Sequence, residues 1–211
     1  MSAAAPPSSS ADVPVRRQDA ARATSSTRER IETAALGLFA ARGVAGTSMR
    51  DIAHEVGVTE GAIYRHFASK DDLARALFLS RYGALARGVE AIRAREPDFG
   101  RRLEALVKLF ANAFDEDPAG FAYVLVSQHE HLRELAADSP DNAVESLGRV
   151  FADAMARGEI PEQDVALVTA LALGLVVQPA IFRIYGRLRQ SPSAYAATIA
   201  GAIRRAVGAP A

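Results

Sequence analysis

Three helix-start signals between residues 47 and 70 constrain the fold of this chain more than any other feature. Ser48, Thr59 and Ser69 each stand where a helix N-cap is expected, and a carboxylate follows Ser48 and Ser69 three residues later, at the capping-box spacing. Gly57 suits the left-handed backbone that ends a helix. The segment therefore predicts two short helices separated by a tight turn, followed by the start of a third, which is the layout of a helix-turn-helix.

The second short helix is expected to have one buried side and one side free to enter a DNA groove. Ile63 and Phe67, four residues apart, define the buried side. At about 100° per residue, the residues that point away from this side or flank it are Gly61, Ala62, Tyr64 and Arg65. Such a face is narrow enough to enter a groove, and its arginine can form two hydrogen bonds with guanine. The alternative is an ordinary solvated face that carries one arginine.

An amphipathic helix at 28–43 supplies the support that a helix-turn-helix needs. Its apolar residues follow the i, i+3, i+4, i+7, i+8 pattern, and Gly43 ends it. Together these residues resemble the TetR family of bacterial transcriptional regulators. The matching elements are Ile31-x-x-Ala34-Ala35-x-x-Leu38-Phe39, Gly43, Gly46-Thr47-Ser48, Arg50-Asp51-Ile52-Ala53, Gly57-Val58-Thr59-x-Gly61-Ala62-Ile63-Tyr64-x-His66-Phe67 and Ser69-Lys70-x-x-Leu73.

The resemblance implies a DNA-binding role for particular positions. They are Thr47, Ser48, Arg50, Thr59, Glu60, Gly61, Ala62, Tyr64, Arg65, His66 and Lys70. Those implied to meet phosphate are Thr47, Ser48, His66 and Lys70. The position of Tyr64 packs on the DNA backbone and neighbouring bases, and some relatives read guanine from the position of Arg50. Because Gly61 and Ala62 offer little for side-chain readout, we expect Arg50, Tyr64 and Arg65 to read more of the sequence.

Composition excludes several other classes of protein. The chain has no cysteine, so disulfides and thiol chemistry are not available to it. Its formal net charge is zero, and residues 28–70 hold six basic and five acidic residues, so DNA binding must rest on where charges and backbone N–H groups lie. The apolar run at 165–184 is interrupted by polar residues and is expected to be a buried helix. We expect no membrane partner and a cytoplasmic, nucleoid-associated bacterial location.

The expected fold is all-α, with an N-terminal three-helix head that contains the helix-turn-helix and a C-terminal helical body for ligand binding and dimerisation. Residues 1–25 are expected to be a disordered arm, either a passive tail or a minor-groove arm using Arg16, Arg17 and Arg22. The DNA-binding domain is predicted at 26–88, and the ligand-binding and dimerisation domain at 89–211. A linking helix at 70–95 joins them. Further helices are expected near 99–116, 118–136, 141–157, 162–187 and 192–207.

The helix at 162–187 is apolar on almost every side, so part of its surface needs a partner. The last helix adds an apolar stripe. Two such helices meeting their symmetry mates would form a four-helix interface, as TetR-like proteins do. The residues expected in this interface are Leu171, Leu175, Phe182, Tyr195, Ile199 and Ile203.

Aromatic residues spread through the predicted body could line a ligand cavity, with a few polar anchors. The candidates are Tyr82, Phe110, Phe114, Phe121, Tyr123, Ser127, Gln128, His131 and Phe151. The alternative for each is a plain helical core. A metal site is not expected, because His129 and His131 are two residues apart and cannot share one helical face. Nucleophile-elbow, phosphate-loop and dinucleotide motifs are absent from the sequence, so we expect no enzyme activity and no cofactor.

These features predict a regulator that binds double-stranded DNA at a palindromic operator as a homodimer. We expect a repressor, released when a small apolar effector enters the body. An activator with the same head and an architectural DNA binder without operator preference are the alternatives. A helical enzyme has no feature of the sequence in its favour.

Overall fold

The computed structural model describes residues 26–132, 135–136 and 139–210, and within these ranges every regular element is helical. The elements are α2 (Thr27–Arg42), α3 (Met49–Val56), α4 (Glu60–Tyr64), α5 (Lys70–Arg95), α6 (Phe99–Glu116), α7 (Pro118–His131), α8 (Ala143–Ala156), α9 (Val165–Ile184), the 3-10 helix η1 (Pro192–Tyr195) and α10 (Ala196–Ala206). The predicted all-α class is confirmed. The expected arm at 1–25 lies outside the described residues.

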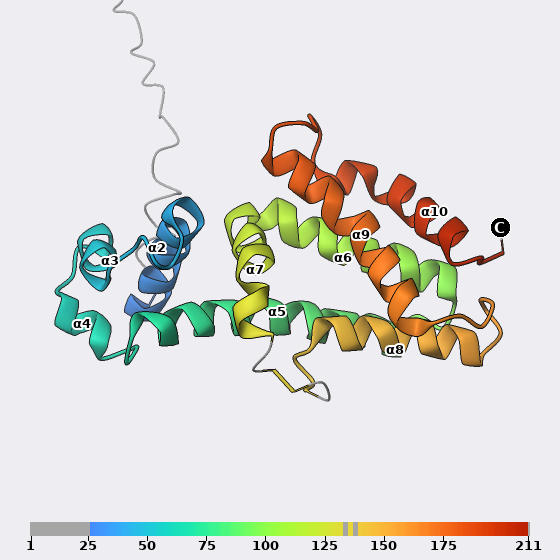
Figure 1. Cartoon of the computed structure of the whole chain (residues 1–211), viewed down its shortest axis with the longest axis horizontal. Helices are drawn as coiled ribbons and strands as arrows, with labels where there is room; N and C mark the ends of the chain where they lie inside the picture. The colour runs from blue at the N-terminus through green and yellow to red at the C-terminus, as the bar shows by residue number, and fades with distance from the viewer. Residues whose placement is uncertain (1–25, 133–134, 137–138, 211) are drawn as a thin grey trace, which may run out of the picture.

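The long helix α5 organises the molecule (Figure 1). Helices α2, α3 and α4 gather at its N-terminal end and form the head. Helices α6, α7 and α8 pack along the rest of α5, and α9 and α10 pack on these helices to complete the body. Helix α7 lies between the two parts, since it packs against both α2 and α5. The body therefore contacts the head directly, through α7.

The head begins its short helices at the caps that the sequence predicts. The Ser48 hydroxyl accepts a hydrogen bond from the backbone N–H of Asp51, and the Asp51 carboxylate accepts one from the Ser48 N–H, so the capping box is complete. Gly57 ends α3 in the left-handed conformation, with φ 74° and ψ 38°. The Thr59 hydroxyl caps α4. These local bonds fix the turn between α3 and α4.

Four element ends differ from the prediction. The Ser69 hydroxyl caps α5, but the Asp72 carboxylate accepts from the N–H of Ala68, so this box is not reciprocal. Helix α4 ends at Tyr64, and Phe67 is buried in the turn that follows the helix. Helix α7 ends at His131, before the predicted end near residue 136, and the last helix begins as the 3-10 turn η1.

Two clusters of buried apolar side chains form the core. One joins α2, α3, α4 and the first part of α5 to residues of α7 and α8, and the other fills the body. On α5, the buried side chains up to Ala86 belong to the first cluster and Val89 belongs to the second. We therefore keep residue 88 as the proposed division between domains.

Ion pairs fasten α5 to α8 inside the body. The Arg93 guanidinium bonds Asp153 at 2.7 Å and Glu90 at 3.0 Å, and Arg149 bonds the other oxygen of Glu90 at 2.8 Å. Burial raises the pKa of Glu90, but the bonds from Arg149 and Arg93 outweigh it and hold this pKa below its ordinary value. The bond from Arg93 likewise lowers the pKa of Asp153. The network joins helices that are distant in sequence.

Candidate DNA-binding surface and interior cavity

Most of the residues predicted to meet DNA lie on one end of the head and are exposed. They are Ser48, Arg50, Thr59, Glu60, Gly61, Tyr64, Arg65 and His66. Half of the surface of Tyr64 is accessible, so its ring is available for contact with a partner. A Cβ atom added at Gly61 would meet nothing within 4 Å, so the chain's own packing does not require glycine there. The outward surface of α4 is therefore narrow, polar and exposed.

Three of the predicted positions instead hold the head together. Thr47 is buried, and its hydroxyl donates to the carbonyl of Gly43 at 3.0 Å. Lys70, which is half-buried, donates from Nζ to the carbonyl of Thr47 at 2.9 Å. Ala62 is buried beside Ile63, because α4 packs with two adjacent residues inward and not with one narrow stripe. The outward face therefore lacks Thr47 and Ala62.

Two basic residues of α2 also contact other segments of the head. The guanidinium of Arg30 donates from Nη2 to the carbonyl of Val56 at 2.6 Å, at the C-terminal end of α3. That of Arg28 lies over the Phe67 ring, 4.5 Å from its centroid. No local sequence pattern predicts either contact, since both join residues far apart in the chain.

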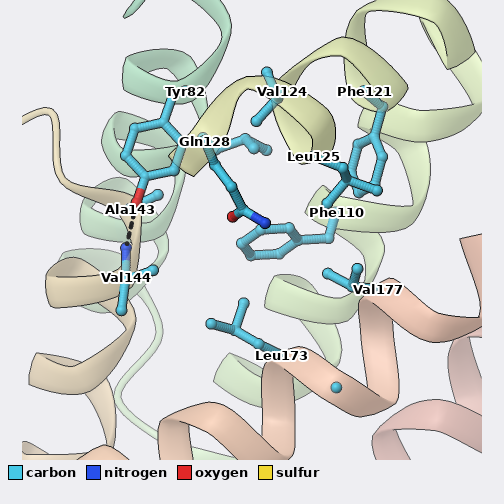
Figure 2. Close-up of a pocket in the computed structure, with 12 residues that line it drawn as sticks. Tyr82, Phe110, Phe121, Val124, Leu125, Gln128, Ala143, Val144, Leu173 and Val177 are labelled. Atoms are coloured by element: carbon cyan, nitrogen blue, oxygen red, sulfur yellow. Dashed lines mark hydrogen bonds between the residues drawn. The ribbon is translucent and has the colours of Figure 1, made fainter. Parts of the chain in front are cut away.

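A cavity of about 230 Å³ lies in the body, between α5, α6, α7, α8 and α9 (Figure 2). It is lined by Tyr82, Leu85, Phe110, Phe121, Val124, Leu125, Gln128, Ala143, Val144, Leu173, Gly174 and Val177. Four of the nine predicted cavity residues are among these, namely Tyr82, Phe110, Phe121 and Gln128. The Tyr82 hydroxyl bonds the N–H of Val144 at 3.3 Å, and burial raises the pKa of Tyr82.

Phe114 and Phe151 lie in the apolar core, away from this cavity wall. The ring of Phe114 packs edge-on against Phe121, with centroids 5.5 Å apart. Phe151 is fully buried, 6.2 Å from the ring of Phe99. Phe114 therefore backs a residue of the wall, whereas Phe151 fills the space between α6 and α8.

Tyr123, Ser127 and His131 recur at every fourth residue of α7 and are absent from the cavity wall. The Tyr123 ring stacks on Phe39 of α2 at 5.9 Å, and its hydroxyl donates to the carbonyl of Ala74 in α5 at 2.9 Å. The His131 ring lies 4.9 Å from that of Phe78, also in α5. Ser127 is buried between them along the helix. Helix α7 thus turns one face to the cavity and another to α5 and the head.

Helix α9 has an apolar face that the chain leaves exposed. Among the described residues it is the helix that by length and composition could cross a membrane, but Val168, Ala172 and Val176 pack in the body core. One side of α9 is therefore buried in its own chain and the other is exposed, which is the arrangement that the sequence predicts. On the exposed side Leu171 is 45% exposed and Phe182 is 41% exposed.

The other residues predicted in a dimer interface are less accessible. Ile199 and Ile203 are 7% and 1% exposed, because the apolar stripe of α10 packs against α6 and α9 of its own chain. Leu175 and Tyr195 are half-buried against the same core. Within one chain, the exposed apolar surface on this side of the body therefore comes from α9.

No group of three or more histidine, cysteine, aspartate or glutamate residues that could hold a metal ion occurs in the described part of the chain. The side chain of His129 lies outside it. The aromatic and amide groups around the cavity offer apolar contact and one hydrogen-bonding site, and they hold no arrangement of a nucleophile with a base.

Comparison with known proteins places the head in a recognised family. The family model described as bacterial regulatory proteins, tetR family, matches residues 31–77. The HTH-type transcriptional regulator SrpR of Pseudomonas putida is 29% identical over 164 residues, which cover 72% of this chain and 74% of that protein. The uncharacterized HTH-type transcriptional regulator TtgW, also of Pseudomonas putida, is 36% identical over 105 residues, 48% of this chain and 74% of that protein.

Solved structures share the fold over most of the chain. The TetR family regulator PfmR from Thermus thermophilus superposes with a TM-score of 0.70 at 23% identity, covering 83% of this chain and 97% of its own. The regulator FadR of Bacillus subtilis, solved in complex with stearoyl-CoA, superposes with a TM-score of 0.66 at 18% identity, covering 83% and 96%. At these identities the likeness establishes a common fold.

Proposed function

The chain belongs to the TetR family of bacterial regulatory proteins, and from that premise we propose that it is a ligand-responsive repressor that binds a palindromic operator as a homodimer. The observation that carries the proposal is the open face of α4. Tyr64 and Arg65 are exposed there, and Arg50 of α3 is exposed as well, while Thr47, Lys70 and Arg30 bond carbonyl groups of the head.

In this proposal α4 enters the major groove. Arg65 and Arg50 are assigned to base edges, where a guanidinium bonds guanine through two donors. Tyr64 packs on the DNA backbone, and His66 bonds phosphate. Gly61 suits close approach, because no neighbour within the chain occupies the space beside it. One proton of the Lys70 ammonium is used on the Thr47 carbonyl, and a second is proposed to bond phosphate at the N-terminus of α5, where the helix dipole favours an anion.

The exposed face of α9 is proposed to bury itself against the same face of a second copy. Leu171 and Phe182 supply the apolar contact, and a two-fold axis there would bring α9 and α10 of both copies into one four-helix bundle. The two heads would then meet successive major grooves, roughly 34 Å apart, on one side of the operator. DNA affinity would depend on the dimer.

The cavity is proposed as the effector site. Its walls include α5, which carries the head, and α7, whose other face stacks on α2 through Tyr123 and Phe39. A ligand that displaces either wall changes the position of the head relative to its partner. Because effector and DNA then favour different head spacings, each weakens binding of the other, by a coupling of typically about 1–3 kcal/mol.

Selection of bound duplexes from a random DNA library tests the proposal. Wild type, Tyr64→Ala and Arg101→Ala would be compared, since Arg101 is an exposed arginine at the start of α6, outside the head. We expect wild type and Arg101→Ala to enrich the same palindrome and Tyr64→Ala to enrich none. A folded wild-type dimer that enriches no sequence, or a Tyr64→Ala protein that enriches the same one, would contradict the proposal.

A reporter gene then tests the sign of regulation. With the selected palindrome placed across a promoter, the wild-type protein is expected to lower expression and Tyr64→Ala is expected to leave expression unchanged. An increase with wild type would assign activation to the protein.

A further inference from the structure

The wall of the body cavity carries no formal charge. None of its 12 residues is lysine, arginine, aspartate, glutamate or histidine. A carboxylate or phosphate that entered would lose its water without gaining an ion partner, and such desolvation costs several kcal/mol or more. The cavity therefore favours uncharged molecules.

The cavity is partly open to solvent, and its volume suits a small occupant. A roughly 150 Å³ apolar cavity holds benzene, and in proportion about 230 Å³ holds roughly nine non-hydrogen atoms. Sites for drug-sized ligands measure about 300–1,000 Å³. A long acyl chain or a nucleotide-bearing thioester would extend beyond this volume, through the side of the cavity that is open to solvent.

One polar group inside the cavity is free to bind. In Figure 2 the side chain of Gln128 points from α7 into the cavity. Within the described residues this amide has no hydrogen-bond partner, whereas the Tyr82 hydroxyl is already bonded to Val144 and to Asn142. A primary amide both donates and accepts, so it suits a hydroxyl or a carbonyl.

Resting on the ligand-responsive function proposed above, we propose that the effector is an uncharged, mostly hydrocarbon molecule of about nine or ten non-hydrogen atoms with a single hydroxyl or carbonyl group. The Gln128 amide bonds that group. Phe110, Phe121 and Leu173 enclose the hydrocarbon part.

Calorimetric titration with defined probes tests the ligand class. 4-Propylphenol has the proposed size and is neutral near pH 7, because the pKa of a phenol is about 10. 4-Propylbenzoate has a similar shape but carries a charge, and octanoyl-CoA is both charged and large. We expect one 4-propylphenol per subunit, bound at least about 30-fold more tightly than either anion. An anion bound as tightly as 4-propylphenol would overturn the proposal.

Gln128→Leu tests the polar contact, since leucine keeps a similar volume and removes the amide. We expect this substitution to lower the affinity for 4-propylphenol by about five- to tenfold. Propylbenzene, which lacks the hydroxyl, is the matched probe, and its affinity is expected to be the same in wild type and Gln128→Leu, or slightly higher in the variant. Equal weakening of both probes would contradict a hydrogen bond from Gln128.

Two filling variants test the location. Leu173→Trp and Val177→Phe both add volume to the cavity wall, and we expect each to abolish 4-propylphenol binding while circular dichroism and the unfolding midpoint show a folded protein. If one variant fails to fold, the other gives the answer. A folded filling variant that binds 4-propylphenol as wild type does would place the site elsewhere.

The two proposals fail separately. A protein that enriches a palindrome but binds none of the probes would overturn the ligand class and leave the regulator intact. A protein that binds 4-propylphenol in the cavity but enriches no DNA would support the ligand class and overturn the regulatory function.

Discussion

The head and the body each have an apolar core, and they differ in the polar bonds that join their helices. In the head, side chains bond main-chain groups: Thr47 bonds Gly43, Lys70 bonds Thr47, and Arg30 bonds Val56. In the body, long helices are joined by charged side chains and apolar packing, and a cavity of about 230 Å³ remains among them. Main-chain bonds fix the reading surface as one unit, whereas packing around a cavity can adjust to an occupant. The contrast assigns recognition to the head and response to the body.

The largest effect is expected when the partner subunit is lost, because the head then binds DNA alone. Leu171→Asp places a charge on the exposed face of α9, and we expect a monomer by light scattering with operator affinity at least about 100-fold lower, because a single head makes half of the contacts. Val126→Asp is the matched control, since Val126 of α7 is 79% exposed and outside this face. Persistence of the dimer in Leu171→Asp would exclude this interface.

Next in size is a change confined to the reading surface. Arg65→Ala is expected to lower affinity for the selected palindrome by about 10- to 100-fold and to relax preference at one base position, as loss of a bidentate contact does. Its unfolding free energy should equal that of wild type, because Arg65 is exposed. Binding would be measured on matched and mismatched duplexes. An equal loss of affinity for every duplex would show that Arg65 contacts phosphate and does not read a base.

A smaller effect is expected where α7 joins the head. Tyr123→Phe keeps the stacking on Phe39 but removes the hydroxyl that donates to the carbonyl of Ala74, so we expect unfolding free energy to fall by about 1 kcal/mol. Chemical denaturation measures this. Tyr195→Phe is the control, a half-buried tyrosine near the start of α10. A change no larger in Tyr123→Phe than in the control would show that the hydroxyl does not stabilise this junction.

The smallest effect concerns pH. The pKa of Asp153 is lowered by its bond to Arg93, so this pair stabilises the fold above the ordinary carboxyl pKa and is lost as pH falls through the lowered value. Asp153→Asn should therefore unfold more easily than wild type near pH 7, and the difference should shrink below about pH 4. Denaturation at several pH values tests this. A difference that grows toward acid would contradict the assignment.

The same contrast explains how much the sequence could predict. The caps at Ser48, Thr59 and Ser69 are local signals, so the helices of the head were located from residues three or four positions apart. Even there, Lys70 and Thr47 bond across 23 residues, and no local pattern reveals that contact. The capping box of Ser26 and Glu29, which opens α2, was a readable signal that the sequence analysis missed.

In the body, periodicity shows that a helix has an apolar face but not which element covers it. The stripe of Ile199 and Ile203 was expected to meet a partner subunit, and it packs on the chain's own α6 and α9. On α7, Gln128 faces the cavity while Tyr123 faces the head, and both belong to the same apolar, weakly patterned helix. Packing between segments that are distant in the chain decides which neighbour covers each face of a helix. No short sequence pattern encodes that packing.

The most direct test of the account is reciprocal binding between the two parts of the molecule. The operator affinity would be measured with and without saturating 4-propylphenol, and the 4-propylphenol affinity with and without saturating operator. Coupling through α5 and α7 predicts that both affinities fall by the same factor, about 5- to 150-fold. Two affinities that each remain unchanged when the other ligand is bound would contradict the central claim that the cavity controls the reading surface.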